Sequence, residues 1–113
     1  GGVNDQTTRI ENRVGEPTAN PYLYLASQIY SGLDGINNKF TPAIPVDAAY
    51  DTKAEMLPVS LMEAVKALRN DRYLMQKFGA QFCDYILHIK EAEISRFLST
   101  VTDWEHKEYF EIF

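Results

Sequence analysis

The sequence predicts an α+β fold with one or two strands and about five helices. Near the N-terminus, charged residues alternate with uncharged ones, which is the period of an extended strand. Farther along, apolar residues recur every three or four positions behind residues that favour helix starts. The chain has 113 residues, 45% of them hydrophobic, so it is long enough to bury a core.

The predicted strand covers about residues 8–14, and the rest of the first segment, residues 1–19, is expected to be loop. Its period places Arg9, Glu11 and Arg13 on one face. Successive side chains on that face lie about 6.5 Å apart, so the carboxylate is expected between two guanidinium groups. Spacing alone favours an exposed edge strand with weak surface ion pairs.

The first helix is predicted over residues 20–36. Asn20 is a favourable N-cap and Pro21 suits the first helical position. Apolar side chains on several sides of this helix predict that it is largely buried. The following residues, 37–57, contain two prolines and no sustained period, which predicts a long loop.

A helical tail is predicted over residues 58–113. Its first helix begins at Ser60, and Glu63 three positions later predicts a capping box. A break at an Asn-Asp pair precedes a short helix over residues 72–78, which a glycine ends.

The longest helix of the tail is expected over residues 80–98. Its predicted apolar face consists of Phe82, Ile86, Ile89 and Phe97. Thr102 and Glu105 predict a second capping box and a last helix. The aromatic end of that helix is expected to dock on another part of the protein or on another subunit, because it is too apolar to remain in water.

Composition narrows the classes of partner. The net charge is −5, from 11 basic and 16 acidic residues, so neither nucleic acid nor an anionic membrane is an expected partner. Cys83 is the single cysteine, which excludes an internal disulfide and favours a reducing, cytoplasmic setting. There is no long apolar run or signal-like start, and the chain begins with Gly1 rather than Met, so we expect a segment of a longer soluble protein.

Three blocks of sequence carry a resemblance to a known family. They are residues 9–13, 16–23 and 32–36, which have the sequences RIENR, EPTANPYL and GLDGI. Their order and spacing resemble the C-terminal part of the catalytic domain of the glutamine synthetase family. The resemblance implies that the chain is a mostly helical part of an ATP-dependent ligase that makes glutamine from glutamate and ammonia through a γ-glutamyl phosphate intermediate.

The resemblance also implies roles for the charged row. Glu11 corresponds to a ligand of Mg²⁺ or Mn²⁺, Arg9 to a contact with ATP phosphate, and Arg13 to a catalytic residue that contacts glutamate or the transferring phosphoryl group. These residue types suit the chemistry, because hard cations prefer carboxylate oxygens and guanidinium groups bind oxyanions at two points. Family active sites lie between subunits of ring-shaped homo-oligomers, so the segment alone is expected to be inactive.

Two other functions remain open from the sequence. The acceptor could be a polyamine rather than ammonia, as in a γ-glutamylpolyamine synthetase-like ligase, because the acceptor pocket lies mostly outside these residues. Alternatively, the chain is a non-catalytic helical interaction module, in which Arg9, Glu11 and Arg13 form only a surface ladder of ion pairs.

Several other residues are weaker candidates for chemistry. His88 and His106 fit no metal-ligand spacing and are interpreted as structural or surface histidines. Cys83 is interpreted as a core residue. Tyr50 lies where some bacterial members of the family carry a modified tyrosine, but its context differs from the usual one, so an ordinary loop tyrosine is favoured. Helical spacing favours a packing role for Tyr22, Tyr24 and Tyr30.

Overall fold

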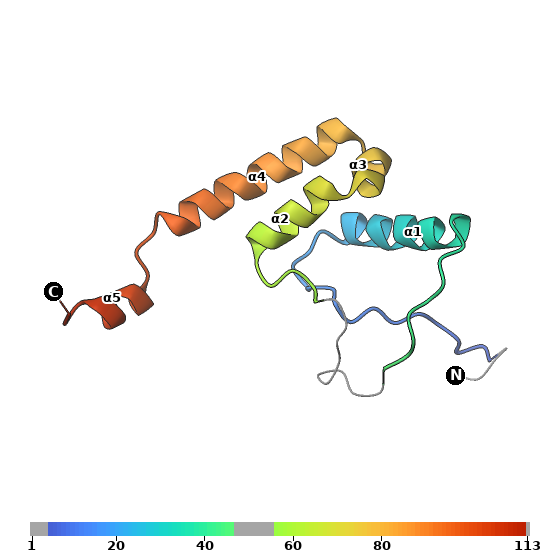
Figure 1. The fold of residues 1–113 in the computed structure, drawn as a ribbon, viewed down its shortest axis with the longest axis horizontal. Coiled ribbons are helices and arrows are strands. Elements are labelled where there is room, and N and C mark those ends of the chain that lie inside the picture. The colour runs from blue at the N-terminus through green and yellow to red at the C-terminus, as the bar shows by residue number, and fades with distance from the viewer. Residues whose placement is uncertain (1–4, 47–55, 113) are drawn as a thin grey trace. The chain divides into compact units, whose positions relative to one another are not determined.

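The computed structural model describes residues 5–46 and 56–112 and contains five helices in them (Figure 1). The chain divides into two compact units, Gly1–Thr41 and Pro42–Phe113. The first unit contains α1, and the second contains the other four helices. Their bounds are α1 Pro21–Asn37, α2 Leu61–Asn70, α3 Arg72–Phe78, α4 Ala80–Leu98 and α5 Asp103–Tyr109.

The α+β prediction is wrong for the described residues, because they contain helices and no strand. Residues 8–16 have no regular secondary structure, although their charges alternate as a strand would require. A strand is defined by a ladder of hydrogen bonds to a neighbouring strand, and the described part of this chain supplies no such neighbour. Alternation fixes the period of a strand but cannot provide its partner.

Helix α1 begins as predicted but is not buried. The Asn20 side chain accepts hydrogen bonds from the backbone N–H groups of Tyr22 and Leu23, and Pro21 is the first helical residue. No residue of α1 is buried, although the sequence predicts a largely buried helix. Five of its large side chains are exposed, and the described part of the first unit contains no second helix or strand to cover them: Tyr22, Leu25, Ile29, Leu33 and Ile36.

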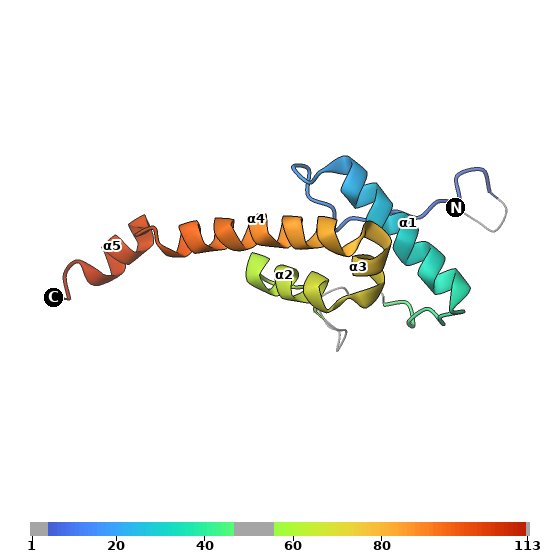
Figure 2. The same ribbon diagram turned by 90° about the horizontal axis from the view of Figure 1, so that it is seen from above.

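The core of the second unit lies between α2 and α4, which run side by side (Figures 1 and 2). Its buried residues are Val65 on α2 and Cys83 and Leu87 on α4. Helical spacing predicts an apolar face of α2 made of Leu61, Ala64 or Val65, and Leu68, and of these Val65 is the buried one. The predicted apolar face of α4 is offset from the buried one by about one position, since Phe82 and Ile89 each remain 41% exposed.

Local features begin α2 and separate α3 from α4. Ser60 Oγ accepts a hydrogen bond from the Glu63 N–H at 3.2 Å, as the predicted capping box requires. The Glu63 carboxylate returns to the N–H of Val59 rather than to that of Ser60. Gly79, between α3 and α4, has φ = 90°, a backbone conformation that favours glycine and permits the sharp change of direction there.

Helix α5 has the predicted capping box in full. Glu105 Oε2 accepts hydrogen bonds from the N–H and the Oγ1 of Thr102, and Thr102 Oγ1 accepts one from the Glu105 N–H. Trp104 and Tyr109 pack edge to face on this helix, with ring centroids 6.0 Å apart. Within the second unit, α5 packs against none of the other described helices (Figure 2). The predicted docking of its aromatic end therefore stays a prediction.

The capping box predicts a pH dependence for α5. Hydrogen bonds from Thr102 hold the pKa of the Glu105 carboxyl below its ordinary value. A lowered folded-state pKa means that the stabilisation is present above the unfolded-state pKa and is lost as the pH falls through the folded-state pKa. We therefore expect α5 to lose order as the pH falls through the lowered folded-state pKa of Glu105, which the amide shifts of Thr102 and Glu105 in NMR spectra would report. In the control, Glu105→Gln, this acid transition should disappear; an unchanged transition would contradict the assignment.

Candidate functional site

The charged row lies in the extended segment that precedes α1. Arg13 Nε lies 2.8 Å from Glu11 Oε1, and the two side chains are 83% and 53% exposed. Arg9 donates from Nη1 to the backbone carbonyl of Thr7 at 3.2 Å. The sequence predicts contacts of Glu11 with both Arg9 and Arg13, and the described residues form the contact with Arg13. An exposed ion pair of this kind contributes about 1 kcal/mol or less to the free energy of unfolding.

A small open hollow accompanies the row. It has a volume of about 230 Å³ and is lined by Thr7, Thr8, Arg9 and Glu11. One cationic and one anionic side chain therefore border the same space, and Arg13 pairs with the anionic one. This arrangement presents a carboxylate oxygen and two guanidinium groups to solvent within one short segment.

Two contacts attach this segment to α1, and the sequence does not reveal either. They are the hydrogen bond between Asn12 and Gln28 and the close approach of Tyr24 to Gly15. Asn12 Nδ2 donates to Gln28 Oε1 at 2.7 Å, and Asn12 Oδ1 accepts from the Val14 N–H at 2.9 Å. A Cβ atom on Gly15 would lie 2.8 Å from the ring of Tyr24, so glycine allows that ring to approach the backbone closely. The only sequence signal was that Asn12 alternates with the charged residues and so belongs to the opposite face.

Glu11 suits a hard cation as one ligand among several. Its side chain is half exposed, and its Oε1 atom forms the ion pair with Arg13. The described residues contain no group of three His, Cys, Asp or Glu side chains able to hold a metal ion. A divalent ion bound by Glu11 would therefore take its other protein ligands from outside the described residues.

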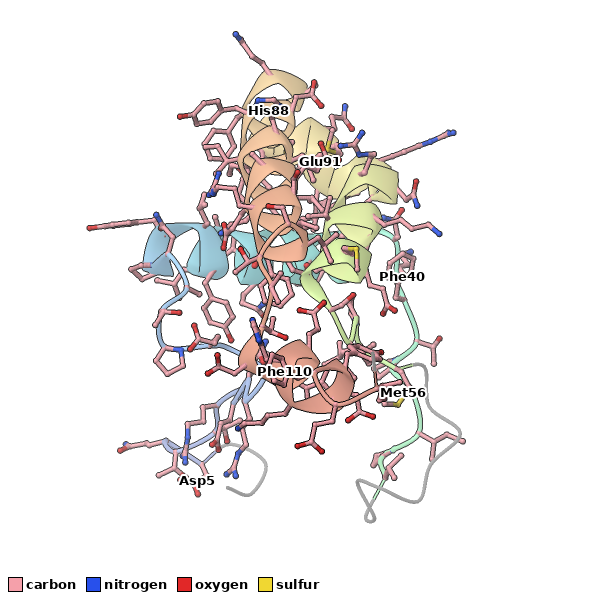
Figure 3. All side chains as sticks on the ribbon, turned by 90° about the vertical axis from the view of Figure 1, so that its left-hand side faces the viewer. Asp5, Phe40, Met56, His88, Glu91 and Phe110 are labelled. Carbon is pink, nitrogen blue, oxygen red and sulfur yellow. The ribbon has the colours of Figure 1, made fainter. Side chains whose placement is uncertain are left out.

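The weaker candidates are placed as follows. His88 is exposed (Figure 3), and so is His106. Cys83 is 2% exposed, which confirms the core interpretation, and burial, followed by the charge of Asp84, raises the pKa of its thiol. Tyr50 lies outside the described residues.

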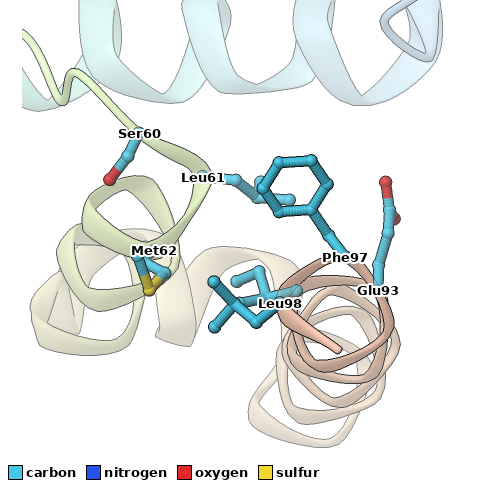
Figure 4. A pocket seen from close by; sticks show the side chains of 7 residues that line it. Ser60, Leu61, Met62, Glu93, Phe97 and Leu98 are labelled. Atoms are coloured by element: carbon cyan, nitrogen blue, oxygen red, sulfur yellow. The ribbon is translucent and has the colours of Figure 1, made fainter. Parts of the chain in front are cut away.

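A second hollow, between α2 and α4, is apolar (Figure 4). It has a volume of about 340 Å³, and its walls include Leu61 and Met62 from α2 and Phe97 and Leu98 from α4. It contains none of the predicted site residues. Beyond it, Arg69 of α2 forms an ion pair with Glu91 of α4, which links the same two helices.

Within residues 5–46 and 56–112, no helix combines the length and the apolar character of a membrane-spanning helix.

Comparison with known proteins identifies relatives along nearly the whole chain. A γ-glutamylanilide synthase from Acinetobacter sp. is 47% identical over 96% of this chain and 24% of its own length. A glutamine synthetase from Methanococcus maripaludis is 35% identical over 93% of this chain and 26% of its own, and lengsin from Canis lupus familiaris is 36% identical over 96% and 19%. The chain thus spans about a quarter or less of the length of these relatives. Residues 2–109 match the family described as glutamine synthetase, catalytic domain, and the chain therefore belongs to that family.

Proposed function

We propose that this chain supplies part of the active site of an ATP-dependent ligase that activates the side-chain carboxylate of glutamate and joins it to an amine. The observation that carries the proposal is the exposed Glu11–Arg13 pair beside Arg9, in a chain whose family is that of the glutamine synthetase catalytic domain. Because the relatives are about four times longer, the complete activity is proposed for the full-length protein that contains this segment.

In the proposed reaction, an oxygen of the glutamate side-chain carboxylate bonds to the γ-phosphorus of ATP while the bond to the ADP oxygen breaks. The nitrogen of the amine then attacks the activated carbonyl carbon of γ-glutamyl phosphate, phosphate leaves, and the nitrogen loses a proton. Negative charge moves between oxygens in the first step, so positive groups fixed in advance lower its barrier.

Each residue of the row has a role in this scheme. Arg9 binds a phosphate oxygen of ATP, and Arg13 orients the glutamate carboxylate or the transferring phosphoryl group through its planar guanidinium group. Glu11 contributes one carboxylate ligand to Mg²⁺ or Mn²⁺, whose charge, when the ion is bound, neutralises phosphate oxygens. The ion pair with Glu11 holds Arg13 Nε, which leaves the terminal nitrogens of the guanidinium group to face a substrate.

The remaining parts of the active site come from elsewhere in the proposed full-length protein. One carboxylate is not a complete divalent-cation site, and the described residues contain no group of three side chains able to hold a metal ion. We propose that these parts belong to the remainder of the protein and to a neighbouring subunit of a ring-shaped homo-oligomer. The exposed apolar side chains of α1 support this proposal, because exposed apolar surface of this extent requires a covering partner.

An aromatic amine is a second candidate acceptor, beside ammonia. The relative named γ-glutamylanilide synthase is 47% identical to this chain, whereas the glutamine synthetase from M. maripaludis is 35% identical. The name of that relative adds an arylamine to the acceptors to be tested, while the acceptor pocket itself is proposed to lie outside these residues.

ADP release by the full-length protein, measured with glutamate and one amine at a time, tests the activity and the acceptor together. We expect ADP release to require both glutamate and an amine, and the kcat/KM values for ammonium, putrescine and aniline to identify the acceptor, since one well-placed apolar group changes binding by about 1–3 kcal/mol. A preference for ammonium would assign glutamine synthesis and remove the arylamine. No glutamate-dependent ADP release with any amine would remove the ligase itself and leave an interaction module.

A further inference from the structure

The extended segment that carries the charged row is held by side chains rather than by a backbone ladder. Within the described residues, its backbone has no sheet partner, and the hydrogen bonds near its two ends are turn contacts. Asn12 lies at its centre and makes two hydrogen bonds, one to Val14 in the same segment and one to Gln28 on α1. The bond to Gln28 joins residues 16 positions apart, so it links the segment to a rigid element.

Asn12 stands directly between Glu11 and Arg13 in the chain. Its side chain is bonded to α1, whereas the side chains of Glu11 and Arg13 are exposed and pair with each other. Holding Asn12 against α1 therefore fixes the stretch of backbone that carries Glu11 and Arg13. The close approach of Tyr24 to Gly15, one helical turn before Gln28, attaches the same segment at a second point.

We infer that Asn12 and Gln28 form a positioning pair, in which a side-chain hydrogen bond from α1 sets where Glu11 and Arg13 stand in the active site. The inference rests on the proposed metal and glutamate roles of these two neighbours. Neither Asn12 nor Gln28 touches a reacting atom, and they act only through the residues that they place. Breaking the bond frees the segment to shift, and groups that hold a metal ligand in place typically change metal affinity about tenfold or more when they are removed.

The test uses the full-length protein with Asn12→Ala, Gln28→Ala, the double variant and Gln28→Glu. The last variant keeps an oxygen that can accept the hydrogen bond from Asn12 Nδ2. Mn²⁺ binding is measured directly by electron paramagnetic resonance without substrates, beside KM for glutamate, kcat, and Tm in the absence of metal. Ser31→Ala, an exposed change one turn farther along α1, is the control.

We expect Asn12→Ala and Gln28→Ala each to weaken Mn²⁺ binding about tenfold, with the double variant no weaker than either and Tm nearly unchanged. Gln28→Glu should restore binding to within about twofold of wild type, as should the control. Wild-type Mn²⁺ affinity in both alanine variants, or a loss in Gln28→Glu as large as in Gln28→Ala, would overturn the positioning pair. Glu11→Gln distinguishes the positioning pair from the proposed metal role of Glu11. If Glu11→Gln weakens Mn²⁺ binding while Asn12→Ala does not, only the positioning pair fails. If Glu11→Gln has no effect on Mn²⁺ binding, the proposed metal role fails.

Discussion

Replacing Glu11 with glutamine in the full-length protein is expected to lower kcat at saturating ATP and glutamate by about 10²- to 10³-fold. The substitution preserves the size of the side chain and one oxygen, but it removes the negative charge that a hard divalent cation requires. Higher Mn²⁺ or Mg²⁺ should be needed for the activity that remains. The measurement is a titration of ADP release with each metal.

Glu16→Gln is the matched control for this change. Glu16 is an acidic residue of the same segment, and its carboxylate accepts a hydrogen bond from the Thr18 N–H at 2.8 Å, a local contact that an amide oxygen can maintain. We expect its metal titration to match that of the wild type. Equal titration curves for Glu11→Gln and the wild type would exclude Glu11 from the metal site and favour an ordinary surface ion pair with Arg13.

Arg13→Lys is expected to reduce kcat/KM for glutamate by about 10- to 100-fold, since a hydrogen bond to a charged group contributes about 1.5–3 kcal/mol. Lysine preserves the positive charge but lacks the planar fork that contacts a carboxylate at two points. It also loses the fixed geometry of the Nε contact with Glu11. Initial rates at varied glutamate and fixed, saturating ATP would measure the change.

Arg9→Lys provides the comparison, because it makes the same chemical change four residues earlier. Its effect should fall on KM for ATP, since Arg9 borders the hollow beside Glu11 and is assigned to phosphate. If Arg9→Lys mainly raises KM for ATP and Arg13→Lys mainly lowers kcat/KM for glutamate, the two arginines have separate roles. If both variants altered the two KM values alike, the row would be acting as an undivided patch of positive charge.

The helices could be predicted from sequence because their signals are local. Asn20, Ser60 and Thr102 each cap a helix through hydrogen bonds to residues two or three positions away, and Gly79 ends one helix and precedes the next. The buried face of α4 was harder to predict, because apolar residues stand side by side at several turns. Packing of α4 against α2 and α3 determines that Cys83 and Leu87 are buried, and the sequence of α4 alone does not indicate this.

The strand and the supports of the site could not be predicted for the same physical reason. Both depend on groups far apart in the sequence: a strand requires a ladder partner, and Asn12 is held by Gln28, 16 positions away. The motif around Glu11 suggested which residues carry the chemistry, and those roles stay predictions. It did not indicate that Arg9 donates to the Thr7 carbonyl while Arg13 takes the carboxylate.

The edge-to-face pair on α5 has a practical consequence for spectroscopy. Trp104 is the sole indole in these 113 residues, it is 62% exposed, and a phenol ring lies 6.0 Å away. Its emission is therefore a built-in optical reporter of this one helix. A shift of that emission to shorter wavelength as protein concentration rises would record the C-terminal helix leaving water, with no label attached.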